Sequence, residues 1–130
     1  MTLPNTTHGD YVVGIVGTGA MGRGIAQICA QAGLTVKLFD VAAGAAEAAR
    51  QSVAGTFGML ADKGRMTAAA AAAATARMSA VGDLAALADA AVVVEAIVER
   101  LDAKQGLFRD LEAIVAPEAI LATNTSSISI

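Results

Sequence analysis

The sequence of 130 residues has little of several residue types that mark common protein classes. It contains one cysteine, one histidine and no tryptophan, and aromatic residues make up only 3%. A single cysteine, Cys29, excludes a disulfide within the chain, which fits a reducing cytoplasm. Because Cys29 lies among alanines on a predicted helix, we interpret it as a small buried side chain. The one histidine, His8, has no Cys, Asp or Glu near it at metal-ligand spacing, so the sequence indicates no metal site.

Positive charge and long apolar runs are also lacking. A net charge of −3 and a pI near 4.9 argue against nucleic acid as the main partner. No uncharged apolar stretch reaches the roughly 18 residues of a membrane span, so we expect no membrane partner. Residues 1–10 are polar, contain no Lys or Arg and have no apolar core, so they do not resemble a signal peptide. We interpret them as a flexible tail and expect a cytoplasmic location.

Alanine makes up much of the 55% hydrophobic content, and the length fits one domain with its own core, at residues 11–130. Patterns of strands and helices alternate, which predicts an α/β fold: a Rossmann-type, doubly wound parallel sheet with helices on both faces. Thr67 is a candidate N-cap, and the apolar run at 91–95 is typical of a strand buried on both faces. The expected strands are 11–16, 35–39, 78–80, 91–95 and 120–123; the expected helices are 20–31, 42–61, 68–76 and 100–115, with a brief turn or helix at 84–87.

A glycine-rich turn, Gly17-Thr18-Gly19-Ala20-Met21-Gly22, follows the first predicted strand and opens a helix. The first glycine allows a tight turn, and the second lets backbone approach a pyrophosphate. The third lets the helix pack closely on the strand, and the phosphates would lie on the free N–H groups at the helix start. A glycine-rich turn without a ligand is the alternative. The surrounding strand and helix favour a dinucleotide.

Asp40 ends the second predicted strand, 18 residues after the last glycine of the turn. A carboxylate here accepts hydrogen bonds from the adenosine ribose hydroxyls and repels a 2′-phosphate. No arginine follows it, so the sequence favours NAD over NADP. Asp40 can also serve as the N-cap of the next helix, and the two roles are compatible.

Other polar residues lie at the same expected edge of the sheet. Glu95 ends the fourth strand and Glu99 opens a helix. The two acids can bind a ligand, or they can be only the negative charges that the helix dipole favours at a helix start. Lys104 can be a solvated helix lysine. Asn124 and Ser126 follow the last strand and can bind a substrate oxygen or cap a turn. The residues alone leave these alternatives open.

Three segments resemble the 3-hydroxyacyl-CoA dehydrogenase family. They are Gly14–Gly22, the run Val94-Glu95-Ala96-Ile97-Val98-Glu99 with Lys104 and Phe108 after it, and Ala119–Ser127. The first is shared with other NAD-linked dehydrogenases, whereas the other two, in this order and spacing, are specific. The resemblance extends from about residue 11 to residue 130.

The resemblance implies roles for individual residues. Asp40 would bind the adenine ribose, and Ser126 would lie near the nicotinamide and the substrate hydroxyl. Thr56 and Lys63 fall where the family contacts CoA, although an exposed helix-end lysine needs no ligand. The implied cofactor residues are Gly17, Gly19, Ala20, Met21, Gly22, Asp40, Glu99, Lys104 and Ser126.

The implied reaction is reversible oxidation of an (S)-3-hydroxyacyl-CoA by NAD. The family's general base is a histidine beyond the Asn124–Ser127 loop, and no residue of this sequence matches it. We therefore expect a fold that is cut before the last strands and before a helical substrate and dimerisation domain. This chain alone should bind NAD without catalysing, and the parent enzyme should be a homodimer. The alternatives are a relative that acts on a hydroxy acid without CoA, such as an L-gulonate dehydrogenase, and a non-catalytic module like the lens lambda-crystallins.

Overall fold

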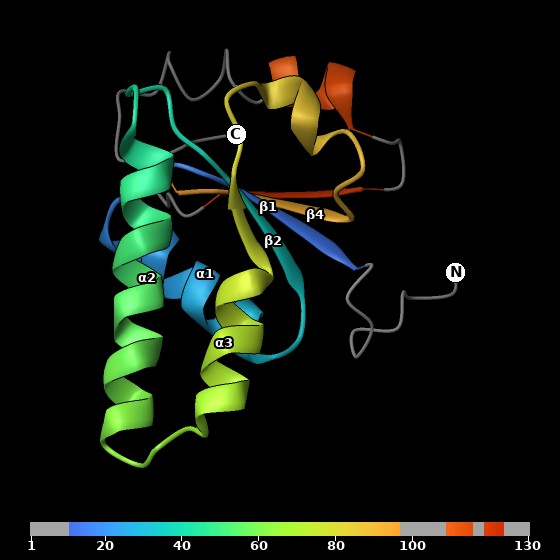
Figure 1. Cartoon of the computed structure of the whole chain (residues 1–130). Coiled ribbons are helices and arrows are strands. Elements are labelled where there is room, and N and C mark those ends of the chain that lie inside the picture. Colours follow the sequence, from blue (N-terminus) through green and yellow to red (C-terminus); the bar gives the residue numbers. More distant parts are fainter. Residues whose placement is uncertain (1–10, 97–108, 116–118, 124–130) are drawn as a thin grey trace.

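The computed structural model describes residues 11–96, 109–115 and 119–123, and these form a parallel sheet covered by helices (Figure 1). The strand order is β3-β2-β1-β4-β5, and every pairing is parallel. This order places the first strand at the centre, where the winding direction of the chain reverses. The predicted doubly wound parallel sheet is confirmed. The strands are β1 (Val12–Val16), β2 (Thr35–Phe39), β3 (Met78–Ala80), β4 (Val92–Glu95) and β5 (Ile120–Thr123).

The central strand β1 is buried at all five positions. Val13 and Ile15 face one side of the sheet, and Val12 and Val16 face the other, because side chains alternate along a strand. β1 therefore contributes to two separate cores. Both cores hold the carboxyl end of β1, where the glycine turn begins, in a fixed position.

Helices cover both faces, as the sequence predicts (Figure 1). On one face lie α1 (Ala20–Gln31), α2 (Ala45–Asp62) and α3 (Ala68–Ala76), whose buried alanines pack with Phe57 against the sheet. On the other face Leu87, from the 3₁₀ turn η1 (Leu84–Leu87), packs with Leu111, from a helical stretch at 109–114. Small alanine side chains allow α1 and α3 to lie close to the strands.

One helix-end signal acts as predicted, and a second contact connects two helices. The Thr67 hydroxyl accepts a hydrogen bond from the N–H of Ala70, which caps α3. The Arg77 guanidinium, after α3, donates to the carbonyl of Ala30 near the end of α1 at 2.7 Å. A cation suits this position because the carboxyl end of a helix is negative.

Some predicted boundaries and burials are wrong. α2 begins at Ala45 and not at residue 42, because Gly44 has a φ of 79° and the chain turns there before the helix starts. Tyr11 and Ala91 lie just outside their strands. Val92 and Val94 of β4 are only half buried, because α1, α2 and α3 pack mainly over β1, β2 and β3.

Several predictions fall outside the described residues: the tail at 1–10, the first part of the helix at 100–115 and the loop at 124–130. Within the described ranges, no helix is both long and apolar enough to cross a membrane. In the same part of the chain, no group of His, Cys, Asp and Glu side chains gathers to hold a metal ion.

Candidate functional site

The glycine turn lies at the carboxyl end of β1 and joins it directly to α1. Gly17 has a φ of 98°, a conformation that side chains other than glycine rarely adopt. Its N–H donates to the carbonyl of Phe39, the last residue of β2, at 2.8 Å. The turn is therefore tied to the end of β2, where Asp40 follows.

The other two glycines of the motif meet different surroundings. A Cβ atom on Gly22 would lie 2.0 Å from the carbonyl oxygen of Gly17, so α1 could not pack this closely on the turn with any side chain there. A Cβ on Gly19 would meet nothing within 4 Å. Gly22 thus allows α1 to pack closely on the turn. Gly19 leaves the backbone of the turn exposed, so that a phosphate can approach it closely.

The N-terminus of α1 carries no side-chain cap from the described residues, and its first turn has no acidic residue. In contrast, α3 is capped by Thr67, and α2 has Glu47 in its first turn. The first N–H groups of a helix lack partners within the helix, and the helix dipole makes this end positive. An anion can take the place of the absent cap at α1.

Asp40 is fixed by hydrogen bonds on both carboxylate oxygens. Thr18 donates twice to Oδ2, from its backbone N–H and from its hydroxyl, each at 2.8 Å. The N–H of Ala42 donates to Oδ1 at 2.9 Å. The carboxylate is thereby held at the glycine turn, and Oδ1 keeps room for a further donor such as a ribose hydroxyl.

The ionisation of Asp40 follows from the same contacts. Its partial burial by itself raises the pKa, but the hydrogen bonds from Ala42 and Thr18 outweigh this effect and hold the pKa below the usual carboxyl value. Asp40 is therefore an anion at neutral pH. A negative group here attracts hydroxyl donors and repels a phosphate.

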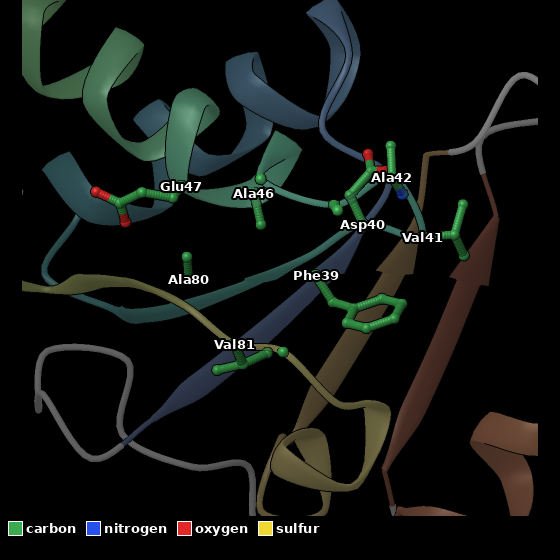
Figure 2. Close-up of a pocket in the computed structure, with 11 residues that line it drawn as sticks. Phe39, Asp40, Val41, Ala42, Ala46, Glu47, Ala80 and Val81 are labelled. Carbon is green, nitrogen blue, oxygen red and sulfur yellow. The ribbon is translucent and has the colours of Figure 1, made fainter.

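Two hollows meet at Asp40. One, of about 500 Å³, is lined by apolar Phe39 and Val81 and by the carboxylates of Asp40 and Glu47 (Figure 2). The other, of about 380 Å³, lies between the glycine turn and α2 and includes Thr18 and Gly19. Asp40 is thus accessible from both sides.

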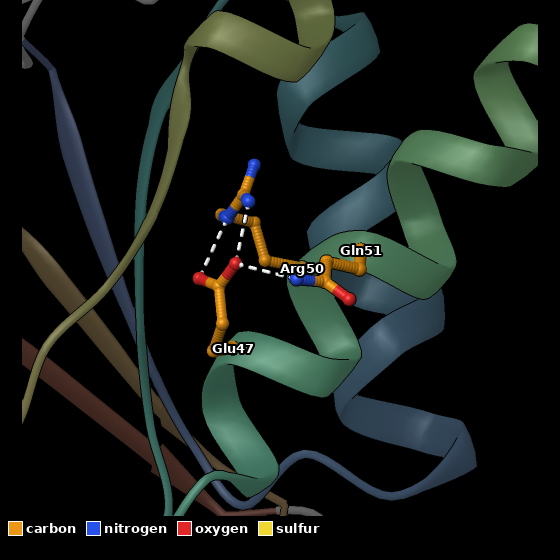
Figure 3. A network of polar contacts seen from close by, with 3 residues as sticks. All are labelled: Glu47, Arg50 and Gln51. Atoms are coloured by element: carbon orange, nitrogen blue, oxygen red, sulfur yellow. Dashed lines mark hydrogen bonds and ion pairs between the residues drawn. The ribbon is translucent and has the colours of Figure 1, made fainter.

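Glu47 at the rim of the first hollow belongs to a small polar network (Figure 3). Arg50 donates to both of its carboxylate oxygens, and Gln51 donates to one of them at 3.1 Å. The hydrogen bonds from Arg50 and then Gln51 lower the pKa of Glu47 to about 2. Arg50 compensates the charge of Glu47, and none of the described basic residues lines the first hollow, so Asp40 is the unpaired charge there.

The structure brings some predicted residues to this site and leaves others apart. Ala20 and Met21 lie on the first turn of α1, and Met21 is 50% exposed. Thr56 lines a groove between α1 and α2, whereas Lys63 follows the end of α2 and does not line that groove. Glu95 is fully buried beside Val16 at the carboxyl end of β4. Glu99, Lys104, Asn124 and Ser126 lie outside the described residues.

The contribution of Thr18 was not predicted from the sequence. In the motif Thr18 is only the spacer between two glycines, whereas in the structure its buried side chain holds Asp40 in place. A hydroxyl residue inside the turn, together with an acid at the end of the next strand, is the signal that could have indicated this contact.

These features define a Rossmann-type dinucleotide-binding domain: a parallel sheet of this strand order, a close-packed glycine turn, a helix start without a side-chain cap, and a fixed acid after β2. The chain belongs to the family described as "3-hydroxyacyl-CoA dehydrogenase, NAD binding domain", whose model matches residues 12–130. Its cofactor is therefore NAD, as predicted.

Individual relatives support this assignment. The chain is 40% identical over 118 residues to the 3-hydroxybutyryl-CoA dehydrogenase of Bradyrhizobium diazoefficiens. The matched region covers 91% of this chain and 40% of the relative. The chain is 39% identical to the 3-hydroxyadipyl-CoA dehydrogenase of Escherichia coli, with 91% of this chain and 25% of the relative covered. The chain thus spans less than half the length of these curated relatives.

Solved structures give the same result. The (S)-3-hydroxybutyryl-CoA dehydrogenase of Ralstonia eutropha superposes with a TM-score of 0.85 at 39% identity, covering 92% of this chain and 42% of that one. The 3-hydroxybutyryl-CoA dehydrogenase of E. coli K12 gives a TM-score of 0.87 at 38% identity, covering 92% and 25%.

Proposed function

We propose that this chain is the NAD-binding part of an (S)-3-hydroxyacyl-CoA dehydrogenase of the 3-hydroxybutyryl-CoA type. The observation that carries the proposal is the fixed Asp40 carboxylate beside the uncapped start of α1, in a chain of this family. The relatives' names point to acyl-CoA thioesters as substrates. We further propose a cytoplasmic enzyme that forms a homodimer through a region beyond the part matched here.

The proposed roles follow the geometry of the turn. The backbone of Gly17, Gly19 and the first turn of α1, including Ala20, Met21 and Gly22, would hold the pyrophosphate with N–H donors and the positive helix end. Asp40 would accept hydrogen bonds from the adenosine ribose hydroxyls, and Thr18 would keep it oriented. The exposed Met21 would cover the bound dinucleotide.

The remaining proposed contacts rest on the family resemblance. Glu99 and Lys104 would contact NAD, and Ser126 would position the substrate hydroxyl against the nicotinamide. Thr56 and Lys63 would contact CoA, Thr56 from inside the groove between α1 and α2. NAD supplies the hydride acceptor, and the protein supplies binding, orientation and electrostatics.

The discrimination between NAD and NADP tests this proposal. We expect calorimetric titration of the chain to show tighter binding of NADH than of NADPH by at least about tenfold, or roughly 1.4 kcal/mol. The physical reason is that a 2′-phosphate would meet the Asp40 anion in a hollow that no described basic residue lines. Asp40→Asn should reduce the preference, because the amide carries no charge. Equal affinity of the unaltered chain for the two nucleotides would contradict the role of Asp40.

A further inference from the structure

Arg23 and Asp40 line the same hollow from different elements. The hollow, of about 380 Å³, lies between the glycine turn and α2; Arg23 belongs to α1, and Asp40 follows β2. The other described residues that line it are small and uncharged: Thr18, Gly19, Ala42, Ala45, Ala48 and Ala49. The described lining of this hollow therefore carries one cation and one anion.

The two charges have separate partners. Both carboxylate oxygens of Asp40 accept hydrogen bonds from Thr18 and Ala42, and these bonds, without a contribution from Arg23, lower the pKa of Asp40. Arg23 instead donates its Nε to the carbonyl of Gly19 at 3.3 Å, so its side chain folds back over the first turn of α1. Because the two groups do not bind each other, each keeps capacity for a ligand.

The terminal nitrogens of Arg23 have no partner among the described residues, although the side chain is half buried. The other half-buried basic side chains in the described part of the chain all bind groups of the protein: Lys37, Arg50 and Arg77. A guanidinium presents N–H donors in a planar fork that matches two oxygens of a carboxylate or a phosphate. Arg23 keeps this fork for an anion outside the protein.

The position of Arg23 is unfavourable for the helix that carries it. It is the fourth residue of α1, near the positive end of the helix dipole, and the first turn contains no acid to offset its charge. Residues that break a local rule in this way are expected at functional sites. The conflict with the dipole points to a role of Arg23 outside the helix.

The two charges indicate the chemistry of the ligand. The Asp40 carboxylate accepts hydrogen bonds, so it suits hydroxyl donors, whereas Arg23 suits an anion. A ribose 5′-phosphate carries both kinds of group, with the 2′ and 3′ hydroxyls on one side of the sugar and the phosphate on the other. Because Arg23 contacts Gly19, the phosphate end of such a ligand would lie over the glycine turn and the hydroxyl end at Asp40.

We propose that Arg23 is a further cofactor-binding residue, whose guanidinium holds the pyrophosphate of NAD at the phosphate next to the adenosine ribose. The inference rests on the proposed NAD site, because it takes the adenosine ribose to lie on Asp40. It adds a side-chain cation to the backbone N–H groups of the glycine turn. A 2′-phosphate extends from the hydroxyl end of the ribose, toward Asp40, so Arg23 acts on NAD and NADP alike.

Calorimetric titrations of the whole chain with NADH, NADPH and ADP test this inference. Arg23→Ala should weaken the binding of NADH and of ADP by about tenfold, because each loses charge-assisted hydrogen bonds to the phosphate next to adenosine. The preference for NADH over NADPH should stay within about twofold of its value in the unaltered chain. Arg23→Lys should restore part of the affinity, because lysine keeps the charge but not the planar fork.

Two further measurements separate a direct contact from an effect on the fold. Raising the salt concentration should weaken NADH binding to the unaltered chain more than to Arg23→Ala, because salt screens the contact that the variant lacks. The variant should unfold at the same or a higher urea concentration, since alanine favours a helix and the change removes a cation from the positive end of α1. Arg65→Ala removes an exposed charge after α2 and is the matched control, so it should leave NADH binding unchanged.

Four results would overturn the inference. If Arg23→Ala binds NADH and ADP as the unaltered chain does, Arg23 makes no contact with the cofactor. A loss confined to NADPH assigns Arg23 to the 2′-phosphate, and a loss for NADH without one for ADP assigns it to the nicotinamide half. An equal loss in Arg65→Ala indicates general charge attraction. In all four the unaltered chain still binds NADH and the proposed function stands, whereas an unaltered chain that binds neither NADH nor ADP contradicts the proposed function as well.

Discussion

At the scale of single residues, the site depends on how Thr18 holds Asp40. Two of the three hydrogen bonds to the carboxylate come from Thr18, and one of these uses the side chain. The hydroxyl therefore does more than fill space between two glycines. It fixes the orientation of the acid before any ligand arrives, which lowers the entropy cost of binding.

Replacing Thr18 with Val keeps the shape of the side chain and removes the hydroxyl donor. We expect the free energy of unfolding at pH 7 to fall by about 1 kcal/mol, a value for a hydrogen bond to a partly exposed charge. Because the pKa of Asp40 is lowered in the folded state, its stabilising effect is complete above the unfolded value of 3.8 and is lost as pH falls through the folded value. The difference between the two proteins should therefore shrink in acid. Urea unfolding across a pH series measures it, and a difference that is constant with pH would contradict the coupling.

The sequence alone predicted Asp40 as the ribose-binding acid but not the bonds that hold it. Strand periodicity and the spacing from the glycines place an acid at the end of β2. The contact of Thr18 with Asp40 joins residues 22 positions apart, and it exists only because Gly17 bonds to Phe39 and brings the two strand ends together. Such a contact is a property of the sheet, which a local pattern does not contain.

At the scale of elements, α1 packs closely against the turn after β1 because Gly22 has no side chain. Gly22 brings the helix so close to the turn that a Cβ would lie 2.0 Å from the Gly17 carbonyl. The sequence predicted this packing role, and the observed bounds of α1 match the predicted ones. The start of α2 could not be predicted in the same way. The N–H of Ala42 bonds to Asp40 and Gly44 adopts a positive φ, so a local turn after Asp40 delays a helix that alanine-rich sequence favours from residue 42.

Gly22→Ala tests how tightly the two elements are joined. We expect a loss of about 1–3 kcal/mol in unfolding free energy, since the new methyl group must push α1 away from the turn. The matched control is Gly58→Ala on α2, where a Cβ would meet nothing within 4 Å. That control should be neutral or more stable, because alanine favours a helix over glycine. Urea unfolding of both variants gives the comparison, and equal effects would show that α1 does not depend on the close approach.

At the scale of the whole molecule, the described residues form an NAD-binding domain with its candidate cofactor site at one edge of the sheet. The glycine turn and Asp40 lie at the carboxyl ends of β1 and β2, where open α/β sheets bind ligands. Motifs with fixed spacing predicted that the glycine turn and Asp40 lie at this edge, and their roles in binding stay predictions. Contacts at Glu99, Lys104 and Ser126 stay predictions, since they lie outside the described residues.

The purified chain of 130 residues should bind NADH and show no oxidation of NADH that depends on acetoacetyl-CoA. Hydride transfer with a 3-hydroxyacyl-CoA also moves a proton, and a positioned general acid or base contributes about 10²–10⁴-fold to such a step. The one histidine, His8, precedes β1 in the chain, whereas the glycine turn follows it. The NADH absorbance in the presence of acetoacetyl-CoA is the measurement, with the full-length Ralstonia eutropha relative as the positive control. Turnover by the purified chain above the rate without enzyme would contradict this expectation.

The sheet also has an edge that bears on the behaviour of the whole molecule. β5 pairs with β4, and among the described strands it has no neighbour on its other side. Ile120, the first residue of β5, is 51% exposed. An unpaired strand edge with an exposed apolar side chain favours pairing with a second copy.

Ile120→Lys should therefore reduce self-association of this chain. A lysine on an edge strand adds a charge that two paired copies would have to bring together, so strand pairing between them becomes unfavourable. Sedimentation velocity at increasing concentration should show a larger sedimentation coefficient for the unaltered chain and a constant monomer value for the variant. The matched control is Ile28→Lys, which removes an even more exposed apolar side chain, 69% exposed, from the surface of α1. If the helix variant suppresses association as strongly as the strand variant does, general apolar contact and not the edge of β5 joins the copies.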